Sequence, residues 1–271
     1  MKEKIRCPVA AGMFYPEYGN EILEYINAFV QMKDSGNLAR AIIAPHGAWE
    51  ISGSMAVDAF MRAGGRREIT RVVLLGPIHD KREEGIFLSN SHFFDTPLGM
   101  LPVDREVSKD LEYYSEFLKT DDIPHLGEHS IEVLLPFVKY FFPDASIVPI
   151  LMGRPSVEMI TDLSQALRTV LGPVAENTLF VVSSCLSCSH DKTTARHLAE
   201  ESVRLVLEKN TPQLISSVLN GRIKTCGGAI IASLLGSGLL DQKQPRFIGE
   251  EMVSAAEEDG DTVFYGVVSF E

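Results

Sequence analysis

Short apolar segments alternate with longer amphipathic segments along almost the whole sequence, and this alternation constrains the fold more than any other feature. The apolar segments are rich in Val and Ile, and most of them stop at Gly or Pro, as strands that are buried on both faces do. The predicted strands span residues 39–44, 72–75, 146–151, 178–182 and 263–270.

The segments between these strands carry apolar residues at three- and four-residue spacing, which is the pattern of a helix with one buried face. Asp104 and Ser156 precede two of them as helix caps, and Thr211 precedes Pro212 at a first helical position. The predicted helices span residues 54–63, 104–118, 130–141, 157–171, 193–209, 212–219 and 228–239.

Strands and helices in turn predict an α/β fold, with a mixed, mostly parallel sheet and helices on both of its faces. The last strand follows an acidic stretch, residues 257–261, and is expected to pair antiparallel. Neither a linker nor an internal repeat divides the sequence. We therefore predict one three-layer domain over residues 1–271.

Charge and cysteine content narrow the partners and the compartment. The chain carries 37 Asp and Glu against 25 Lys and Arg, a formal net charge of −12, so nucleic acid and anionic membrane surfaces are not expected partners. It contains neither an apolar run of about 18 residues nor an apolar segment behind its charged start, so we expect no membrane span and no signal peptide. Four cysteines make no disulfide framework, which predicts a reduced, cytoplasmic protein.

Potential metal ligands follow three of the predicted strands. His46 follows the first strand, His79 follows the second, and a Cys/His group from Cys185 to His190 follows the strand at 178–182. In open α/β sheets the functional crevice lies beyond the carboxyl ends of the strands, so these side chains are expected at one edge. A single histidine is more often a hydrogen-bonded structural residue, but two at equivalent strand ends favour a site.

Three further residues have both a structural and a functional interpretation. Cys226 precedes two glycines and an apolar helix, where unpaired backbone N–H groups favour the thiolate, although free cysteines are often buried and inert. Glu128 and His129 lie just outside a helix start at Ser130, with Glu132 as an acidic first-turn residue. They are therefore either part of a helix cap or the wall of a site.

Cys185 and Cys188 form one C-x-x-C motif, which by itself is a weak signal. It is compatible with a thioredoxin-like redox pair, or with zinc if His190 and a fourth ligand join it. The sequence has no phosphate-binding P-loop, no G-x-S-x-G and no H-E-x-x-H, which argues against ATPases, serine hydrolases and zincins.

Taken in order, several motifs resemble those of the Memo family, which in prokaryotes is named as component B of the AmmeMemoRadiSam system. They are Arg6-x-Pro8-x-Ala10-Ala11-Gly12-x-Phe14-Tyr15-Pro16, Ala44-Pro45-His46, Ser52-Gly53, Gly76-Pro77-x-His79, Thr96-Pro97-Leu98-Gly99, Glu128-His129-Ser130-x-Glu132-Val133, Pro136-Phe137, Ser183-Ser184 and the closing residues 265–270. The resemblance implies a fold like that of the LigB-like, class III extradiol dioxygenases, which use non-haem iron. It also implies that His46, His79 and Cys226 are the ligands of one divalent metal ion, Fe(II) in the first place, with Zn or Cu as alternatives.

The sequence departs from the family pattern at two places. Gly47-Ala48-Trp49 stands where the family usually has Ala-Gly-Tyr, which alters the pocket wall. Cys185 and Cys188 stand where the family usually has Asp and His, and in the related dioxygenases that His acts as acid and base near the metal. His129 or His190 would then have to carry the proton, while Cys188 becomes a possible fourth ligand.

Three functional hypotheses follow from the residues and the resemblance. In the first, an enzyme uses the metal centre for redox or O₂-dependent chemistry on a small or peptide-borne substrate, with Glu128 and His129 lining the pocket. In the second, the metal anchors a non-catalytic partner protein that binds a peptide or the AMMECR-like and radical-SAM proteins of its system. In the third, Cys185 and Cys188 form a thiol-redox pair.

Overall fold

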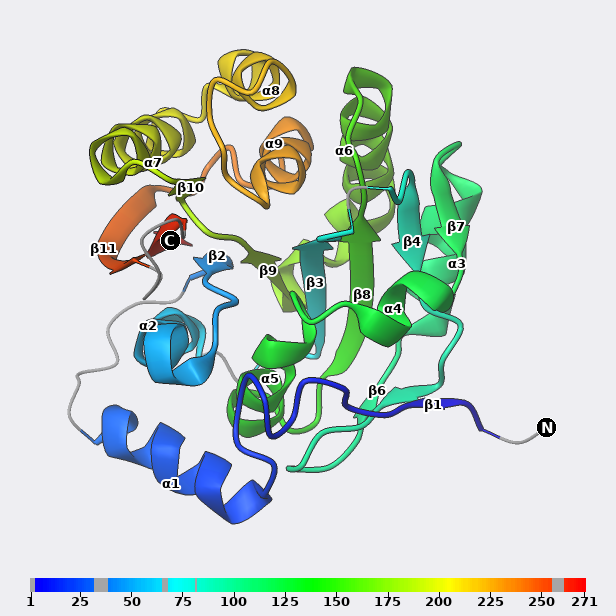
Figure 1. Cartoon of the computed structure of the whole chain (residues 1–271). Helices are drawn as coiled ribbons and strands as arrows, with labels where there is room; N and C mark the ends of the chain where they lie inside the picture. Colours follow the sequence, from blue (N-terminus) through cyan, green and yellow to red (C-terminus); the bar gives the residue numbers. More distant parts are fainter. Residues whose placement is uncertain (1–2, 32–38, 65–67, 81, 255–260) are drawn as a thin grey trace.

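A mixed β-sheet forms the middle layer of the molecule (Figure 1). The computed structural model describes residues 3–31, 39–64, 68–80, 82–254 and 261–271. Within this part of the chain, nine strands pair in the order β10-β12-β2-β9-β3-β8-β4-β7, with β11 on the other edge of β12. The parallel strands at the centre are β2 (Ala41–Ala44), β9 (Thr178–Ser183), β3 (Arg71–Pro77) and β8 (Ser146–Met152).

Antiparallel strands flank this parallel centre. The predicted last strand, β12 (Thr262–Phe270), pairs antiparallel with β2, as expected. β11 (Pro245–Ser254) pairs along its whole length with β12, and the sequence did not predict it, because Gly249 introduces a register shift and two glutamates interrupt the apolar pattern. The shorter strands are β4 (Ile86–Leu88), β7 (Leu118–Thr120) and β10 (Ser187–Ser189), and β1 (Ile5–Arg6), β5 (Phe93–Phe94) and β6 (Leu101–Pro102) form a separate small sheet.

Helices cover both faces of the sheet, which confirms the predicted α/β class. Alternate residues of β3 face opposite sides, so Val72 and Leu74 join one apolar cluster and Val73 and Leu75 join the other. The first cluster is completed by α1 (Gly19–Val30), α2 (Trp49–Ala63) and α5 (Leu135–Phe141), and the second by α3 (Arg105–Tyr113), α6 (Val157–Leu171), α7 (Lys192–Leu207), α8 (Thr211–Leu219) and α9 (Gly228–Gly236).

Several helix boundaries differ from the prediction. The helix predicted at 104–118 ends at Tyr113, and its last predicted residue belongs to β7 instead. The segment at 130–141 is split into a short 3₁₀ helix, Glu132–Leu134, followed by α5. The sequence also missed α1 and the five-residue α4 (Ile123–Gly127). The first two differences lie at element ends, where local patterns are weakest, whereas α1 and α4 are whole elements that the pattern did not indicate.

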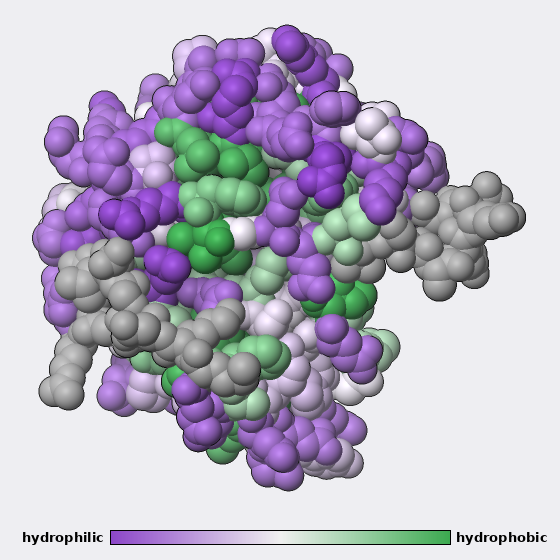
Figure 2. All heavy atoms as spheres, turned by 90° about the vertical axis from the view of Figure 1, so that its left-hand side faces the viewer, coloured by the Kyte–Doolittle hydropathy of each residue, from purple (hydrophilic) through white to green (hydrophobic). Residues whose placement is uncertain are grey.

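The side of the molecule where α7 and β11 lie carries an apolar band within a hydrophilic surface (Figure 2). Val203, Leu207 and Phe247 line a groove between these two elements. Among the described residues, no helix combines the length and the apolar character needed to cross a membrane.

Candidate metal centre

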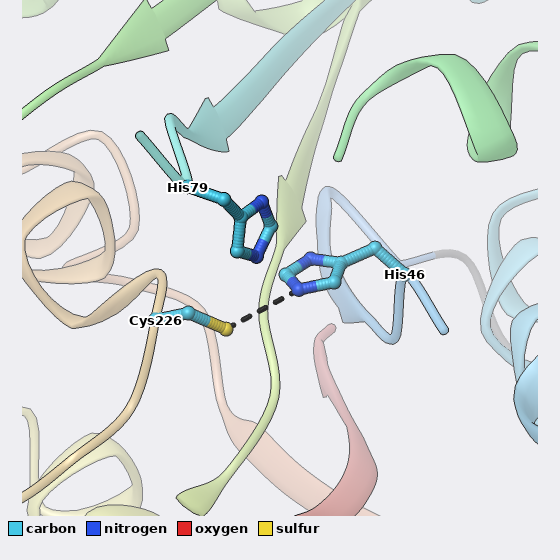
Figure 3. A group of neighbouring side chains, drawn as sticks. All are labelled: His46, His79 and Cys226. Atoms are coloured by element: carbon cyan, nitrogen blue, oxygen red, sulfur yellow. Dashed lines mark hydrogen bonds between the residues drawn. The ribbon is translucent and has the colours of Figure 1, made fainter. Parts of the chain in front are cut away.

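Three potential metal ligands from distant parts of the sequence meet beyond the carboxyl ends of the central strands. His46 lies two residues after β2, His79 lies two residues after β3, and Cys226 lies two residues before α9. Figure 3 shows both imidazole rings and the Cys226 side chain directed toward a common space. One ligand atom from each residue lies within 4.8 Å of the other two.

The distances within this group suit coordination. The Nε2 atom of His46 lies 3.3 Å from the Sγ atom of Cys226. A tetrahedral ion with bonds of about 2.0 Å to nitrogen and 2.3 Å to sulfur would hold two such atoms about 3.5 Å apart. The rings of His46 and His79 stand nearly perpendicular, at 87°, with centroids 5.0 Å apart. His46 is buried whereas His79 is exposed, so the group opens to solvent on the His79 side.

A fixed chain of hydrogen bonds sets the tautomer of His46. The hydroxyl of Ser183 donates to the backbone carbonyl of Ser130, with an O–O distance of 2.6 Å. Because that donation uses its only proton, the Ser183 oxygen must accept from Nδ1–H of His46, which lies 2.7 Å away. Nδ1 of His46 therefore carries a proton, and Nε2, the atom that faces Cys226, is the one available for a ligand. This is the form in which histidine binds a metal.

Glu128 orients His79 in the same manner. Its carboxylate accepts the backbone N–H of His79 at 2.7 Å and the backbone N–H of Ser130 at 2.7 Å, and one oxygen lies 2.9 Å from Nδ1 of His79. Burial raises the pKa of Glu128, but the hydrogen bonds and charge of His79 outweigh burial and lower the pKa to about 2. Glu128 is thus an anion that accepts from Nδ1–H, which leaves Nε2 of His79 for a ligand.

The charges of His79 and Cys226 balance each other. Burial lowers the pKa of His79, but hydrogen bonds with Cys226 and Glu128 overcome this and raise it to about 10. Burial raises the pKa of Cys226, whereas contacts with Cys185, His46 and His79 bring it well below its usual value. The group therefore pairs a protonated imidazole with a thiolate, and a metal ion would have to displace an Nε2 proton in order to bind.

Cys185 is in direct contact with Cys226. Their sulfur atoms are 2.7 Å apart. The hydrogen bond with Cys226 and burial both raise the pKa of Cys185 well above its usual value, so the proton of the pair stays on Cys185. Among the described residues, the close group of potential ligand atoms that contains His46 and His79 includes the sulfur of Cys226 but not that of Cys185.

His129 lies beside His46 and His79 at the wall of the site. Its ring stacks on His79, with centroids 4.6 Å apart, and contacts the tilted ring of Phe14 at a centroid distance of 4.3 Å. Its Nδ1 atom is 3.4 Å from Glu128. Burial lowers the pKa of His129 to about 4 despite the nearby carboxylate, so the ring is neutral at pH 7. His79, Glu128 and His129 also form a second group of closely spaced ligand atoms, which shares His79 with the first.

The structure places the other two sequence candidates away from this group. His190 is exposed, and its Nδ1 atom lies 3.1 Å from a carboxylate oxygen of Asp261. Cys188 lies on β10 and interacts with the same aspartate, and burial together with that hydrogen bond raises its pKa to about 11. Among the described residues, neither one joins a group of three potential ligands.

Glu132 is the acidic first residue of the 3₁₀ helix, as the sequence interpretation has it, but its side chain also makes long-range contacts that the sequence did not reveal. Its side chain is fully buried, ion-paired with Arg6, and accepts the hydroxyl of Tyr15 at 3.0 Å. It also accepts the backbone N–H groups of residues 9 and 10. Arg6 in turn donates to the backbone carbonyls of His125 and Glu128. The N-terminal segment therefore fastens the loop that carries Glu128 and His129.

A small cavity adjoins the thiol side of the centre. It has a volume of about 330 Å³ and lies between the ends of β3 and β8 and the start of α9. Pro77, Met152 and Ile230 contribute apolar wall, Arg154 lies on its lining, and Cys226 forms part of one side. Sequence reasoning had not identified this cavity, because its walls come from four separate segments.

Comparison with known proteins places these residues in a family. A sequence profile described as Memo-like protein matches residues 6–262. The chain belongs to the Memo-like family. Proteins named MEMO1 family protein from Thermotoga neapolitana and Nitrosopumilus maritimus are 30% and 29% identical to it, over 86% and 85% of this chain and 88% and 86% of theirs. A relative with the same family name from Methanocaldococcus jannaschii is 28% identical over 90% of this chain and 91% of its own.

A solved structure supports the fold of this Memo-like chain independently. The crystal structure of an uncharacterized protein from Escherichia coli K12 matches it with a TM-score of 0.54, covering 85% of this chain and 99% of the other. At 12% sequence identity, the likeness is one of architecture only. The family resemblance read from the motifs is confirmed by the profile and the relatives.

Proposed function

We propose that this Memo-like chain holds one divalent metal ion on His46, His79 and Cys226 and uses it in redox chemistry on a small-molecule or peptide-borne substrate. The observation that carries the proposal is the meeting of three ligand atoms while Nδ1 of each imidazole is already hydrogen-bonded. Two imidazoles and a thiolate suit Fe(II), Zn or Cu. We expect Fe(II), by resemblance to the LigB-like non-haem iron dioxygenases.

Each supporting residue has a definable role in this proposal. A bound ion supplies Lewis acidity and, if it is iron or copper, one-electron redox chemistry. Ser183 and Glu128 hold the two imidazoles in the metal-binding tautomer. His129, neutral and stacked on His79, is placed to take or give a proton at a substrate group beside the ion. The exposed edge of His79 leaves the approach from solvent open.

The cavity beside Cys226 limits the size of the substrate. A volume of about 330 Å³ lies at the lower end of the range for small-molecule sites. Its walls are mainly apolar, so the part of the substrate that enters should be apolar as well. A peptide would reach the ion with one side chain rather than with its backbone.

Metal content of the anaerobically purified protein tests the ligand set. We expect wild type to bind close to one ion per chain, and His46→Ala and Cys226→Ser to lose most of it, as measured by mass spectrometry of the metal. His190→Ala serves as the matched control, because that histidine is exposed and lies outside the group. Full metal content in both ligand variants would remove the basis of the proposal.

A second candidate is a metal-anchored binding protein without turnover, acting with AMMECR-like and radical-SAM partners. The presence of Cys185 and Cys188 in place of the Asp and His usual in the family favours it, because it removes an acid–base group. Catechol-type or peroxide turnover that His79→Ala abolishes supports the enzyme. Metal binding with no turnover, together with capture of a purified partner that requires the bound ion, supports the binding protein.

A further inference from the structure

The sulfur atoms of Cys185 and Cys226 are held face to face by their own backbones. The backbone N–H of Cys185 donates to the sulfur of Cys226 at 2.9 Å, and the backbone N–H of Cys226 donates to the sulfur of Cys185 at 3.4 Å. This reciprocal pair leaves the two sulfur atoms 2.7 Å apart, only about 0.7 Å beyond the length of a disulfide bond.

The two segments that carry these cysteines are joined to each other. The hydroxyl of Thr225 donates to the carbonyl of Cys185 at 2.6 Å, and the backbone N–H of Gly227 donates to the hydroxyl of Ser184 at 3.0 Å. A Cβ on Gly227 would lie 2.7 Å from atoms of residues 183 and 184, so this close approach requires glycine. A covalent link between the sulfurs therefore needs little movement of either backbone.

We propose that Cys185 and Cys226 are an oxidisable dithiol that a hydroperoxide converts into a disulfide, and that the disulfide excludes the metal ion. The exclusion rests on the proposed function, since Cys226 can bind an ion only as a thiolate. The disulfide itself rests on the geometry of the two sulfurs alone. This pair differs from the Cys185–Cys188 pair of the third sequence hypothesis. Cys188 lies on β10 and faces Asp261 instead.

Accessibility sets the order of the reaction. Cys226 lines the cavity and is partly exposed, whereas Cys185 is buried. The Cys226 thiolate attacks one peroxide oxygen, the O–O bond breaks, and the other oxygen leaves as water or an alcohol after taking a proton. The sulfur of Cys185 then attacks the resulting sulfenic acid, the S–O bond breaks, and the hydroxyl leaves as water with the Cys185 proton.

The overall change is balanced. Two thiols and one hydroperoxide give one disulfide, one water, and one alcohol or second water. The sulfur atoms lose the two electrons that the peroxide gains. A dithiol reductant such as dithiothreitol reverses the change by thiol–disulfide exchange.

Peptide mapping of the full-length protein after treatment with one equivalent of hydrogen peroxide tests the disulfide. We expect a link between the peptides of Cys185 and Cys226, loss of two thiols per chain, and recovery in dithiothreitol. Cys188→Ser should behave as wild type, and Cys185→Ser should form no such link while still binding Zn(II). A link between Cys185 and Cys188, or oxidation of Cys226 with no link, overturns the proposal.

Zn(II), which is redox-inert, tests the exclusion. The reduced protein should bind the ion and the oxidised protein should not. With Zn(II) about 100-fold above its Kd, about one chain in 100 has a free site, so the disulfide should form about 100-fold more slowly. An oxidised chain that retains Zn(II) overturns the exclusion. A reduced wild type that binds no metal overturns the proposed function but leaves the disulfide result standing.

Discussion

The hydroxyl of Ser183 is the support whose removal tests the centre most directly. It lies at the end of β9, is fully buried, and connects His46 to the backbone carbonyl of Ser130. Ser183→Ala deletes the acceptor of the His46 Nδ1–H while leaving all three proposed ligands in place. The proton is then no longer held on Nδ1, and the tautomer with a free Nε2 loses its advantage.

The expected magnitude follows from these contacts. Removing a hydrogen-bond partner of a metal-bound histidine typically costs 10- to 100-fold in metal affinity, about 1.4–2.7 kcal/mol. Two buried groups, Nδ1–H of His46 and the carbonyl of Ser130, also lose a partner. Each unsatisfied group costs about 1–3 kcal/mol of stability. The variant should therefore remain folded only if the native protein has a margin of several kcal/mol.

Ser187→Ala is the matched control for this prediction. Ser187 is equally buried, lies on β10, and makes a hydrogen bond to the carbonyl of Ala195 away from the ligands. Competition with a zinc-binding dye measures Kd, and urea unfolding in chelator measures stability. We expect a 10- to 100-fold weaker Kd for Ser183→Ala and an unchanged Kd for Ser187→Ala. A folded Ser183→Ala protein with the wild-type Kd would refute the assigned tautomer.

Three further predictions concern the packing around the site. Arg6→Ala leaves the buried Glu132 without its ion-pair partner, so urea unfolding should show a free energy of unfolding lower by about 3–5 kcal/mol. The control Lys4→Ala removes a half-exposed ion pair and should lower it by under about 1 kcal/mol. Burial lowers the pKa of His125 to about 4, below its ordinary value of 6.5. As the pH falls, the His125 imidazole is therefore protonated in the unfolded chain before it is protonated in the folded chain. The free energy of unfolding is therefore highest above pH 6.5 and falls by about 3 kcal/mol as the pH drops to 4. Unfolding curves of His125→Phe should lack this decline. Gly227→Ala forces a methyl group against the end of β9 and should lower the melting temperature in calorimetry by the equivalent of about 1–3 kcal/mol; an unchanged melting temperature would contradict the close approach.

The strand ends could be predicted because their signals are local. The apolar runs that stop before Pro45 and before Gly76 place His46 and His79 just beyond two strands, and parallel strands end at one edge. The same reasoning could not find β11, whose register depends on pairing with β12 rather than on its own pattern. Local periodicity therefore located the centre of the sheet and β12. It missed strands on both flanks, which are β10 and β11 beside β12 and β4 and β7 beyond β8.

The contacts that support the site could not be predicted, because they join residues far apart in the sequence. The C-x-x-C spacing suggested a pair of Cys185 with Cys188 as one of three hypotheses. In the structure, strand β10 turns Cys188 toward Asp261, and the start of α9 brings Cys226 to Cys185. Glu132 similarly has the pattern of a helix start, yet it is the buried partner of Arg6. In both cases a long-range contact overrides a correct local rule.

Ser130 connects the supports of both proposed histidine ligands. Its backbone carbonyl accepts from Ser183, which orients His46, and its backbone N–H donates to Glu128, which orients His79. Its hydroxyl donates to the carbonyl of Pro77 at the end of β3. Because one residue fixes both imidazoles relative to a strand end, a shift of this loop must disturb both ligands together. The ligand geometry is therefore a property of the loop from residue 125 to 132, and it depends on the Arg6–Glu132 pair that fastens this loop to the N-terminal segment.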